Sequence, residues 1–376
     1  MTVAPIIKGY CPGALRPMMS GDGLVVRIRP FHGRLTSSQA RTIAQLAQRH
    51  GNGLMDLSAR GNIQLRGVTQ EQMAPLIEGL SQLSLIDEDV ERESRRNIMV
   101  TPFWDEGSQT DALVSALNDA LRSENGLEIP GKFGFAVDTD TTCVLQSASA
   151  DVRLERDTKS DLILVADGCP RGKAVTFETA VHEVLALTRW FVLARQGQTR
   201  MARLLRDGMA LPEGFDVPRQ PRHQTPKPGM TPHGALVGLA FGQLTVDTLS
   251  RLADLGPLRM TPWRMILIEG ARDQPDLPDL ITDKDDPLLR VHACTGAPRC
   301  TQGLAQTRPL ARQLVSHLQG TPVLHVSGCA KGCAHPTPAA LTVTATSTGL
   351  NLIRDGCAGD LPQHVDLTLQ DLIKAL

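Results

Sequence analysis

Four cysteines near the C-terminus could bind a soft metal centre. Cys294 and Cys300 form a C-x5-C pair, Cys329 and Cys333 form a C-x3-C pair, and 28 residues separate the pairs. Both pairs lie in glycine-containing stretches, "ACTGAPRCTQG" and "VSGCAKGCAHP". Thiolates bind soft metals, and four of them suit a [4Fe–4S] cluster or a structural zinc ion. Zinc sites usually draw on shorter C-x2-4-C knuckles, and buried cysteines that only fill space rarely come as glycine-flanked pairs. The spacing therefore favours a cluster that transfers electrons.

Positive charges gather at predicted strand ends and turns rather than along helix faces. Strand-end arginines without an adjacent acid often face anionic ligands, although surface arginines paired with local acids are an alternative. The stretch "DGCPRGKA" places two of the cations on a glycine turn just before a helix, where free amides also favour an anion. The charges concerned are Arg27, Arg29, Arg60, Arg66, Arg95, Arg96, Lys132, Arg171 and Lys173.

Two stretches about 200 residues apart share one order of elements. Residues 23–68 predict a strand, a helix that begins at Thr36 or Ser37 and stops at Gly51, and an extended run over 54–68. Residues 234–271 repeat this order, with Leu244-Thr245 matching Leu35-Thr36 and Gly270 matching Gly67. The pattern predicts an internal duplication. Only the first copy keeps a polar face, because Trp263, Leu267 and Glu269 stand where it has Arg60, Gln64 and Arg66.

The composition limits the class of protein. A chain of 376 residues suggests more than one domain, and 41% hydrophobic with 21% charged residues is typical of globular proteins. A net charge of −1 and 3% aromatic residues do not favour nucleic acid or membrane binding. The N-terminus has no apolar leader and no later run has the length of a membrane span. Because the other cysteines are scattered singles, we expect reduced thiols and a cytoplasmic location: Cys11, Cys143, Cys169 and Cys357.

Four motifs resemble the sulfite/nitrite reductase superfamily of tetrapyrrole-binding iron–sulfur proteins: "CTGAPRC", "SGCAKGC", "DLSARGNIQLRG" and "SRRN". The resemblance implies an α+β fold, in which duplicated ferredoxin-like half-domains form a central unit beside two larger α/β units. It also implies that the four paired cysteines hold a [4Fe–4S] cluster. We expect half-domains at 11–75 and 233–275, a tetrapyrrole-binding α/β unit at 84–205, an exposed linker at 206–232 and a cluster-carrying α/β unit at 285–376.

Within the superfamily, "CPGALRPMMSGDGLVVRIRP" and "LSARGNIQLRGV" are most similar to the precorrin-3B synthases, oxygen-dependent enzymes of aerobic cobalamin biosynthesis. The reductases carry arginines in T-x-R-Q and N-x-R-N and two lysines in R-K-F-K, all aimed at an inorganic anion. Arg60, Arg96 and Lys132 match three of these cations and are the implied catalytic residues, whereas Gly134 replaces the second lysine. The lost cation weakens the case for sulfite binding.

The resemblance further implies O2-dependent hydroxylation of precorrin-3A at C-20 with γ-lactone formation. No G-x-G-x-x-G follows a strand, so we expect electrons from an external NAD(P)H-dependent reductase or a ferredoxin. A mononuclear non-haem iron is a candidate second cofactor, and His292 and His335 are candidate ligands or proton donors. The implied tetrapyrrole-binding residues are Arg27, Arg29, Arg60, Gln64, Arg66, Arg96, Asn97, Lys132, Arg171 and Lys173.

Two other functions stay open. A sulfite or nitrite reductase would bind sirohaem, bridged to the cluster through Cys333. A non-catalytic electron carrier or a tetrapyrrole-delivery protein belongs to another class, and the polar strand with Arg60, Gln64 and Arg66 argues against a bare carrier.

Overall fold

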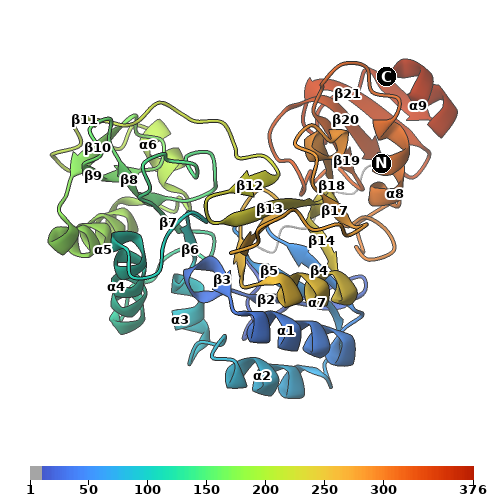
Figure 1. Cartoon of the computed structure of the whole chain (residues 1–376). Coiled ribbons are helices and arrows are strands. Elements are labelled where there is room, and N and C mark those ends of the chain that lie inside the picture. The colour runs from blue at the N-terminus through green and yellow to red at the C-terminus, as the bar shows by residue number, and fades with distance from the viewer. Residues whose placement is uncertain (1–10) are drawn as a thin grey trace.

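The structure is a computed structural model that describes residues 11–376. Its strands form four sheets over these residues, two in a central unit and one in each of two outer α/β units. Figure 1 shows the outer units on opposite sides of the central one, the first in green and the second in orange to red. The mixture of helices with largely antiparallel sheets confirms the predicted α+β class.

The central unit is built from a five-stranded and a six-stranded sheet whose helices pack together. The first sheet has the order β1 (Met18–Ser20), β2 (Gly23–Ile28), β5 (Ile63–Val68), β4 (Leu54–Leu57), β14 (Gln243–Thr245). The second has the order β12 (Gly229–Thr231), β13 (Gly234–Leu239), β16 (Met265–Glu269), β15 (Leu258–Met260), β3 (Arg34–Leu35), and β17 (Leu280–Ile281) also pairs with β13. The helices are α1 (Ser37–His50), α2 (Met73–Gln82) and α7 (Val246–Leu255).

The two copies of the repeat exchange a short strand. β3 of the first copy pairs with β15 of the second, and β14 of the second pairs with β4 of the first. Leu35 and Leu244, carried by the exchanged strands, are 0% and 1% exposed and belong to one hydrophobic core that draws on both copies. Because each sheet is completed by the other copy, the two halves form a single packed unit.

The backbone conformation repeats along with the sequence. His32 and Phe241 are both left-handed (φ 54° and 59°), as are Gly67 and Gly270 (φ 71° and 72°). The helices begin alike, because the Thr36 and Thr245 side chains accept hydrogen bonds from amides three residues on. The predicted duplication is confirmed.

One local prediction was wrong. Residues 54–68 do not form a single extended run but a hairpin, in which β4 and β5 pair around a turn at 58–62. The Ser58 side chain accepts hydrogen bonds from the amides of Arg60 and Asn62, and Gly61 takes a left-handed φ of 64° that closes the turn. The turn brings Arg60 to the tip of the hairpin.

The first α/β unit has a six-stranded sheet covered by helices. Its order is β11 (Val217–Pro218), β10 (Arg171–Ala174), β9 (Leu162–Ala166), β8 (Val152–Arg156), β7 (Phe135–Asp138), β6 (Ile98–Val100), and only β6, β7 and β8 run parallel. Its core lies between this sheet and two long helices. The helices are α3 (Val90–Arg95), α4 (Gln109–Ser123), α5 (Phe177–Ala194) and α6 (Met201–Arg206).

Two segments of this unit differ from expectation. Arg171 and Lys173 lie on strand β10, not on a turn at a helix N-terminus, since α5 begins later, capped by the Thr176 side chain. The proline-rich stretch expected as an exposed linker is partly an edge strand, because β11 pairs with β10 and Arg219 makes an ion pair with Glu155.

The second α/β unit contains the paired cysteines. Its sheet has the order β18 (Val291–Ala293), β19 (Leu324–Ser327), β20 (Ala339–Ala345), β21 (Leu350–Gly356), β22 (His364–Leu367), with the first three strands parallel. Helices α8 (Thr307–Val315) and α9 (Leu369–Ala375) pack against it. Over residues 11–376, no helix is long and apolar enough to cross a membrane.

We predict that Leu35→Ala weakens both halves of the central unit together. Truncating a fully buried leucine costs about 2–5 kcal/mol, and this leucine sits in the exchanged strand. Hydrogen exchange should show lost protection in both α1 and α7. Leu255→Ala is the matched control, since Leu255 is 47% exposed and its truncation should change stability by less than about 0.5 kcal/mol. Loss of protection confined to α1 would contradict the interlocked arrangement.

Candidate metal centre and cationic site

Both cysteine pairs begin at the same edge of the second α/β sheet. Cys294 directly follows β18, and Cys329 comes two residues after the end of β19. These strands are parallel neighbours, with Ala293 paired to Val326, so their carboxyl ends meet at one edge. The amide of Gly328 donates to the Cys294 Sγ at 3.2 Å. The two loops therefore lie against each other although 28 residues separate the pairs.

Three glycines let these loops pack backbone to backbone. Added to Gly296, which has a φ of 63°, a Cβ would stand 2.6 Å from the Ala305 carbonyl oxygen. At Gly303 it would stand 2.7 Å from the Ala297 nitrogen, and at Gly328 it would stand 3.2 Å from the Gly303 Cα. A larger residue at the first two positions forces backbone movement, so the loops can approach this closely only with glycine.

The four thiols share one environment. Burial raises the pKa of the Cys333 thiol, and the charge of Lys331 opposes this, while Cys294, Cys329 and Cys300 raise it further. Within the described residues, no three His, Cys, Asp or Glu side chains come close enough to hold a single metal ion. A [4Fe–4S] cluster asks each thiolate to reach a different iron, whereas zinc requires all four sulfurs around one atom. The thiols of the glycine-lined loops are compatible with a cluster.

Arg66 holds the first cysteine loop against the central unit. Its guanidinium pairs with Asp22 at 2.8 Å and Asp56 at 3.2 Å, and it donates to the Arg299 carbonyl oxygen at 3.2 Å. Burial by itself lowers the pKa of Arg66, but the hydrogen bonds and charges of these two aspartates outweigh it and hold the pKa above its usual value. Arg308 of α8 also pairs with Asp56, at 2.6 Å. The charge of Arg66 is thus balanced within the protein.

The positive charge of Arg96 is likewise balanced by a buried carboxylate, that of Asp87. Its side chain is 3% exposed and donates to both carboxylate oxygens of Asp87, with the shortest distance 2.7 Å. It also donates to the Arg29 carbonyl oxygen and lies over the Phe31 ring at 3.9 Å. The neighbouring Asn97 donates to the Phe133 carbonyl oxygen at 2.9 Å. Sequence reasoning missed Asp22, Asp56 and Asp87 because none of them is adjacent in the chain to the arginine that it pairs with.

Arg27, Arg29 and Arg60 form a group with fewer carboxylates than guanidiniums. We call them the arginine pocket. Arg27 donates to Gln64 at 2.8 Å and Arg29 pairs with Glu93 at 3.2 Å. Arg60 extends to the first α/β unit, where it donates to the Lys132 carbonyl oxygen and to Ser149. Burial lowers the pKa of all three, that of Arg29 to about 10.

Each guanidinium of the arginine pocket has a buried N–H group without a hydrogen-bond partner in the described part of the chain. These are the Nε atoms of Arg27 and Arg29 and an Nη atom of Arg60; the other Nη atom of Arg60 makes the contacts above. Unpaired buried donors are costly, so this pocket is suited to an anionic group.

The other predicted cations lie elsewhere or are exposed. Lys132 is exposed, although its carbonyl oxygen receives Arg60. Lys173 pairs with Glu183 at 2.6 Å, and Arg171 donates to the Asp216 carbonyl oxygen, both within the first α/β unit. These contacts join Arg171 and Lys173 to their own unit and not to the arginine pocket or the cysteine loops.

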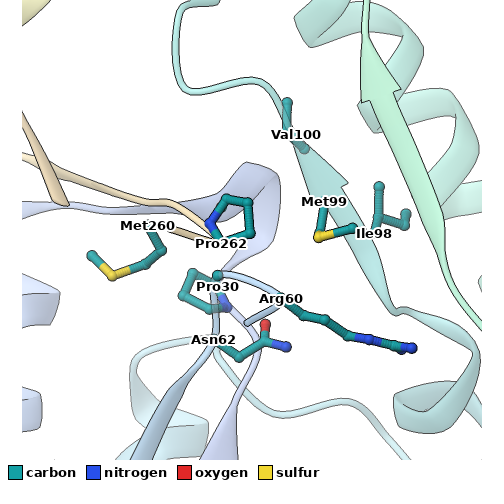
Figure 2. Close-up of a pocket in the computed structure, with 10 residues that line it drawn as sticks. Pro30, Arg60, Asn62, Ile98, Met99, Val100, Met260 and Pro262 are labelled. Atoms are coloured by element: carbon teal, nitrogen blue, oxygen red, sulfur yellow. The ribbon is translucent and has the colours of Figure 1, made fainter. Parts of the chain in front are cut away.

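A small pocket lies beside Arg60. Its volume is about 10 Å³, enough for roughly one water molecule and far too little for a macrocycle. Turns of both repeats and strand β6 line it, and Figure 2 shows Arg60 extending away from Pro30 and Asn62 toward the β6 side. Of the residues that line this pocket, the sequence had predicted only Arg60 as a site residue. The lining consists of Pro30, Gly33, Arg60, Gly61, Asn62, Ile98, Met99, Val100, Met260 and Pro262.

Comparison with known proteins agrees with the fold and the motifs. Residues 16–83 match the family described as the nitrite/sulfite reductase ferredoxin-like half domain. A precorrin-3B synthase of Sinorhizobium sp is 28% identical over 96% of this chain and 86% of its own. These similarities support membership of this chain in the sulfite/nitrite reductase superfamily.

Two further proteins are similar to this chain over most of its length. A ferredoxin–nitrite reductase of Leptolyngbya laminosa is 24% identical over 94% of this chain and 83% of its own. The solved NirA protein of Mycobacterium tuberculosis has a TM-score of 0.64 and 18% identity, covering 93% of this chain and 79% of its own. The NirA likeness confirms the fold of the superfamily.

Gly134, at the position where the resemblance to the reductases implies a second lysine, has little room for a side chain. A Cβ at Gly134 would stand 2.8 Å from the Asn97 side-chain nitrogen and 3.2 Å from the unpaired Arg60 Nη atom. The side-chain ends of Asn97 and Arg60 would therefore have to move to admit a larger residue at this position.

We predict that Arg66→Gln destabilises the contact between the cysteine loop and the central unit. The change leaves Asp22 and Asp56 with one cation fewer in a site where their side chains are 11% and 8% exposed, and breaking such a buried pair costs about 3–5 kcal/mol. Denaturation midpoints and hydrogen exchange over 296–304 would measure the loss. Arg41→Gln removes an exposed ion pair with Asp254 and is the control, with an expected change of less than about 1 kcal/mol. Equal effects of the two changes would contradict the anchoring role of Arg66.

Proposed function

We propose that this chain is a precorrin-3B synthase, an iron–sulfur oxidoreductase that hydroxylates precorrin-3A at C-20 and closes a γ-lactone from the ring A acetate to C-1. One atom of O2 enters the product and the other leaves as water, with two electrons from an external donor. The similarity to the Sinorhizobium synthase over 96% of the chain supports this function.

The observation that carries the proposal is the packing of Gly134. A reductase that captures a small inorganic anion gains from every cation aimed at that anion. Here Gly134 stands at the position of the second lysine, and the Asn97 and Arg60 side-chain ends lie 2.8 and 3.2 Å from an added Cβ, so that both would have to move to admit a side chain. A site with one cation fewer than that of the reductases is better suited to a large carboxylated macrocycle than to a small inorganic anion.

The four cysteines are assigned to a [4Fe–4S] cluster, which when bound supplies electrons one at a time. Cys294, Cys300, Cys329 and Cys333 would hold it, and the Gly328 amide already points at the Cys294 sulfur. Amide–sulfur hydrogen bonds stabilise the more reduced, more negative form of a cluster. The glycines of the two loops thus position both the ligands and the donor that tunes them.

The arginine pocket is assigned to substrate carboxylates. Precorrin-3A carries several acetates and propionates, and burying these anions without cations would be costly. Arg27 and Arg60 offer unpaired N–H groups, with Gln64 held beside Arg27. A guanidinium that pairs with the ring A acetate also keeps it ionised, and the carboxylate is the form that can close a lactone.

Arg66 and Arg96 receive a different role. Both are neutralised by buried aspartates, so we assign them to holding the walls of the site. The exposed Lys132 stays a candidate for long-range attraction of the anionic substrate. We assign no ligands to a mononuclear iron, because over residues 11–376 no three His, Cys, Asp or Glu side chains approach one point.

We propose that an external NAD(P)H-dependent reductase or a ferredoxin donates the electrons. We also propose that the protein acts in the cytoplasm. Relatives named ferredoxin–nitrite reductase support the ferredoxin option.

The decisive experiment is an anaerobic and aerobic incubation of purified protein with precorrin-3A and a reducing system. The proposal predicts conversion to precorrin-3B only with O2, with label from ¹⁸O2 in the product. A visible spectrum distinguishes the synthase from the main rival function, because a sirohaem reductase would show an intense Soret band. Such a reductase would also reduce nitrite or sulfite. Stoichiometric tetrapyrrole binding without O2 consumption would instead support a delivery protein.

We predict that Cys294→Ser removes the iron–sulfur absorbance and the turnover together. Serine does not replace a thiolate as a soft ligand, so iron and acid-labile sulfide should fall to background. Cys357→Ser is the control, because this half-buried thiol bonds to the Pro336 carbonyl oxygen and lies outside the two cysteine motifs. A colourless Cys294→Ser protein that still made precorrin-3B would refute the redox role of the cluster.

A further inference from the structure

Cys11 lies against the arginine pocket and has no role in the function proposed above. It is half-buried and stands at the start of the described chain, before Pro12 and Gly13. The Arg29 Nη2 atom donates to the Pro12 carbonyl oxygen at 3.3 Å, and the Arg27 amide donates to the Gly13 carbonyl oxygen at 3.1 Å. Two residues of the pocket thus fix the backbone beside the thiol.

Three guanidiniums act on the Cys11 sulfur. Arg27 donates a hydrogen bond to it, and the charges of Arg60 and Arg29 also favour its ionised form. Burial would raise the pKa of the Cys11 thiol, but these arginines outweigh burial and hold the pKa below its ordinary value. Glu93 pairs with Arg29 and also accepts hydrogen bonds from the Ala14 and Leu15 amides.

A second observation is that buried N–H groups of the pocket have no hydrogen-bond partner within residues 11–376. Arg29 is 5% exposed, and its Nε atom has no hydrogen-bond partner among the described residues. The Nε of Arg27 and one Nη of Arg60 are in the same state. The charges that act most on Cys11 are those of Arg27, Arg60 and Arg29, and Arg29 also pairs with Glu93.

We propose that Cys11 is a peroxide-reactive modification site, at which the arginine pocket beside it, with its unpaired buried N–H groups, also draws anionic reagents to the sulfur. A thiolate is the nucleophilic form of cysteine, and reactive cysteines stand in electropositive, partly exposed surroundings. With hydrogen peroxide, the sulfur electron pair forms an S–O bond and the O–O bond breaks. Hydroxide leaves and is protonated to water, so that sulfur is oxidised by two electrons to sulfenic acid and peroxide is reduced.

The inference does not depend on the proposed reaction, since it concerns the thiol and the cations alone. It does predict that a polycarboxylate in the arginine pocket protects Cys11. Uroporphyrin, a metal-free porphyrin with eight carboxylates, is a suitable probe.

The experiment follows alkylation of each cysteine by peptide mass spectrometry on the native full-length protein near pH 7. Cys11 should react about tenfold faster than Cys169 or Cys357, two half-buried thiols of the same molecule, because an ordinary thiol is only a few per cent ionised there. The ratio of the iodoacetate rate to the iodoacetamide rate should be several-fold higher at Cys11, since only iodoacetate is an anion. After peroxide treatment, a dimedone adduct should appear on Cys11.

Substitutions test whether the arginine pocket causes the reactivity of Cys11. Arg27→Gln should bring the Cys11 rate toward that of Cys169, whereas Lys227→Gln, which removes a cation of an exposed pair with Asp285, should leave it unchanged. Equal rates and equal reagent ratios at Cys11, Cys169 and Cys357 in the unaltered protein would overturn the proposal, as would a peroxide-treated protein without the Cys11 adduct. Protection by uroporphyrin would add support for the arginine pocket as a carboxylate site, and reactive but unprotected Cys11 would count against that site alone.

Discussion

A buried network of two arginines and two aspartates holds the cysteine loops to the rest of the molecule. Asp56 of β4 receives Arg66 from β5 and Arg308 from α8, and Asp22 completes the set through Arg66. Arg66 then reaches the Arg299 carbonyl oxygen, between the first two cysteines. Two positive and two negative charges cancel in a region sheltered from water, where an unpaired charge would cost several kcal/mol. The position of the cysteine loops relative to the first half-domain depends on this balance.

The duplication explains how the two outer units attach to the centre. Each copy ends its hairpin turn in a left-handed residue, Gly61 at 64° and Arg264 at 61°. An arginine of the first turn, Arg60, binds a carbonyl oxygen of the first α/β unit. An arginine of the second turn, Arg264, binds the carbonyl oxygens of Val291 and Leu289 in the second unit. Each copy thus uses an arginine of its turn to bind carbonyl oxygens of one outer unit. In the first copy, one guanidinium atom of this arginine, beside Gly134, has no hydrogen-bond partner among the described residues.

The arginines in the first part of the chain fall into two groups, according to whether the fold places a buried aspartate beside them. Arg66 and Arg96 meet buried aspartates and become parts of the framework. Arg27 and Arg60 meet amides, carbonyls and a thiol instead, and so keep the capacity to bind an anion. This division separates residues that shape the site from residues that can contact a carboxylated ligand, although all four look alike in the sequence.

The α+β class followed from the resemblance to the superfamily, whereas the sequence by itself determined the cysteine constellation and the duplication. These depend on local signals: thiol spacing, the Leu-Thr helix start at Thr36 and Thr245, and glycines at matching turns, all of which act over a few residues. Only the tertiary structure decided which charges remain available, that 54–68 is a hairpin, and that β3 and β14 change places between the copies. The physical reason is that ion pairing and strand pairing are set by distance in space, and Asp56 lies 252 residues from the Arg308 that it binds.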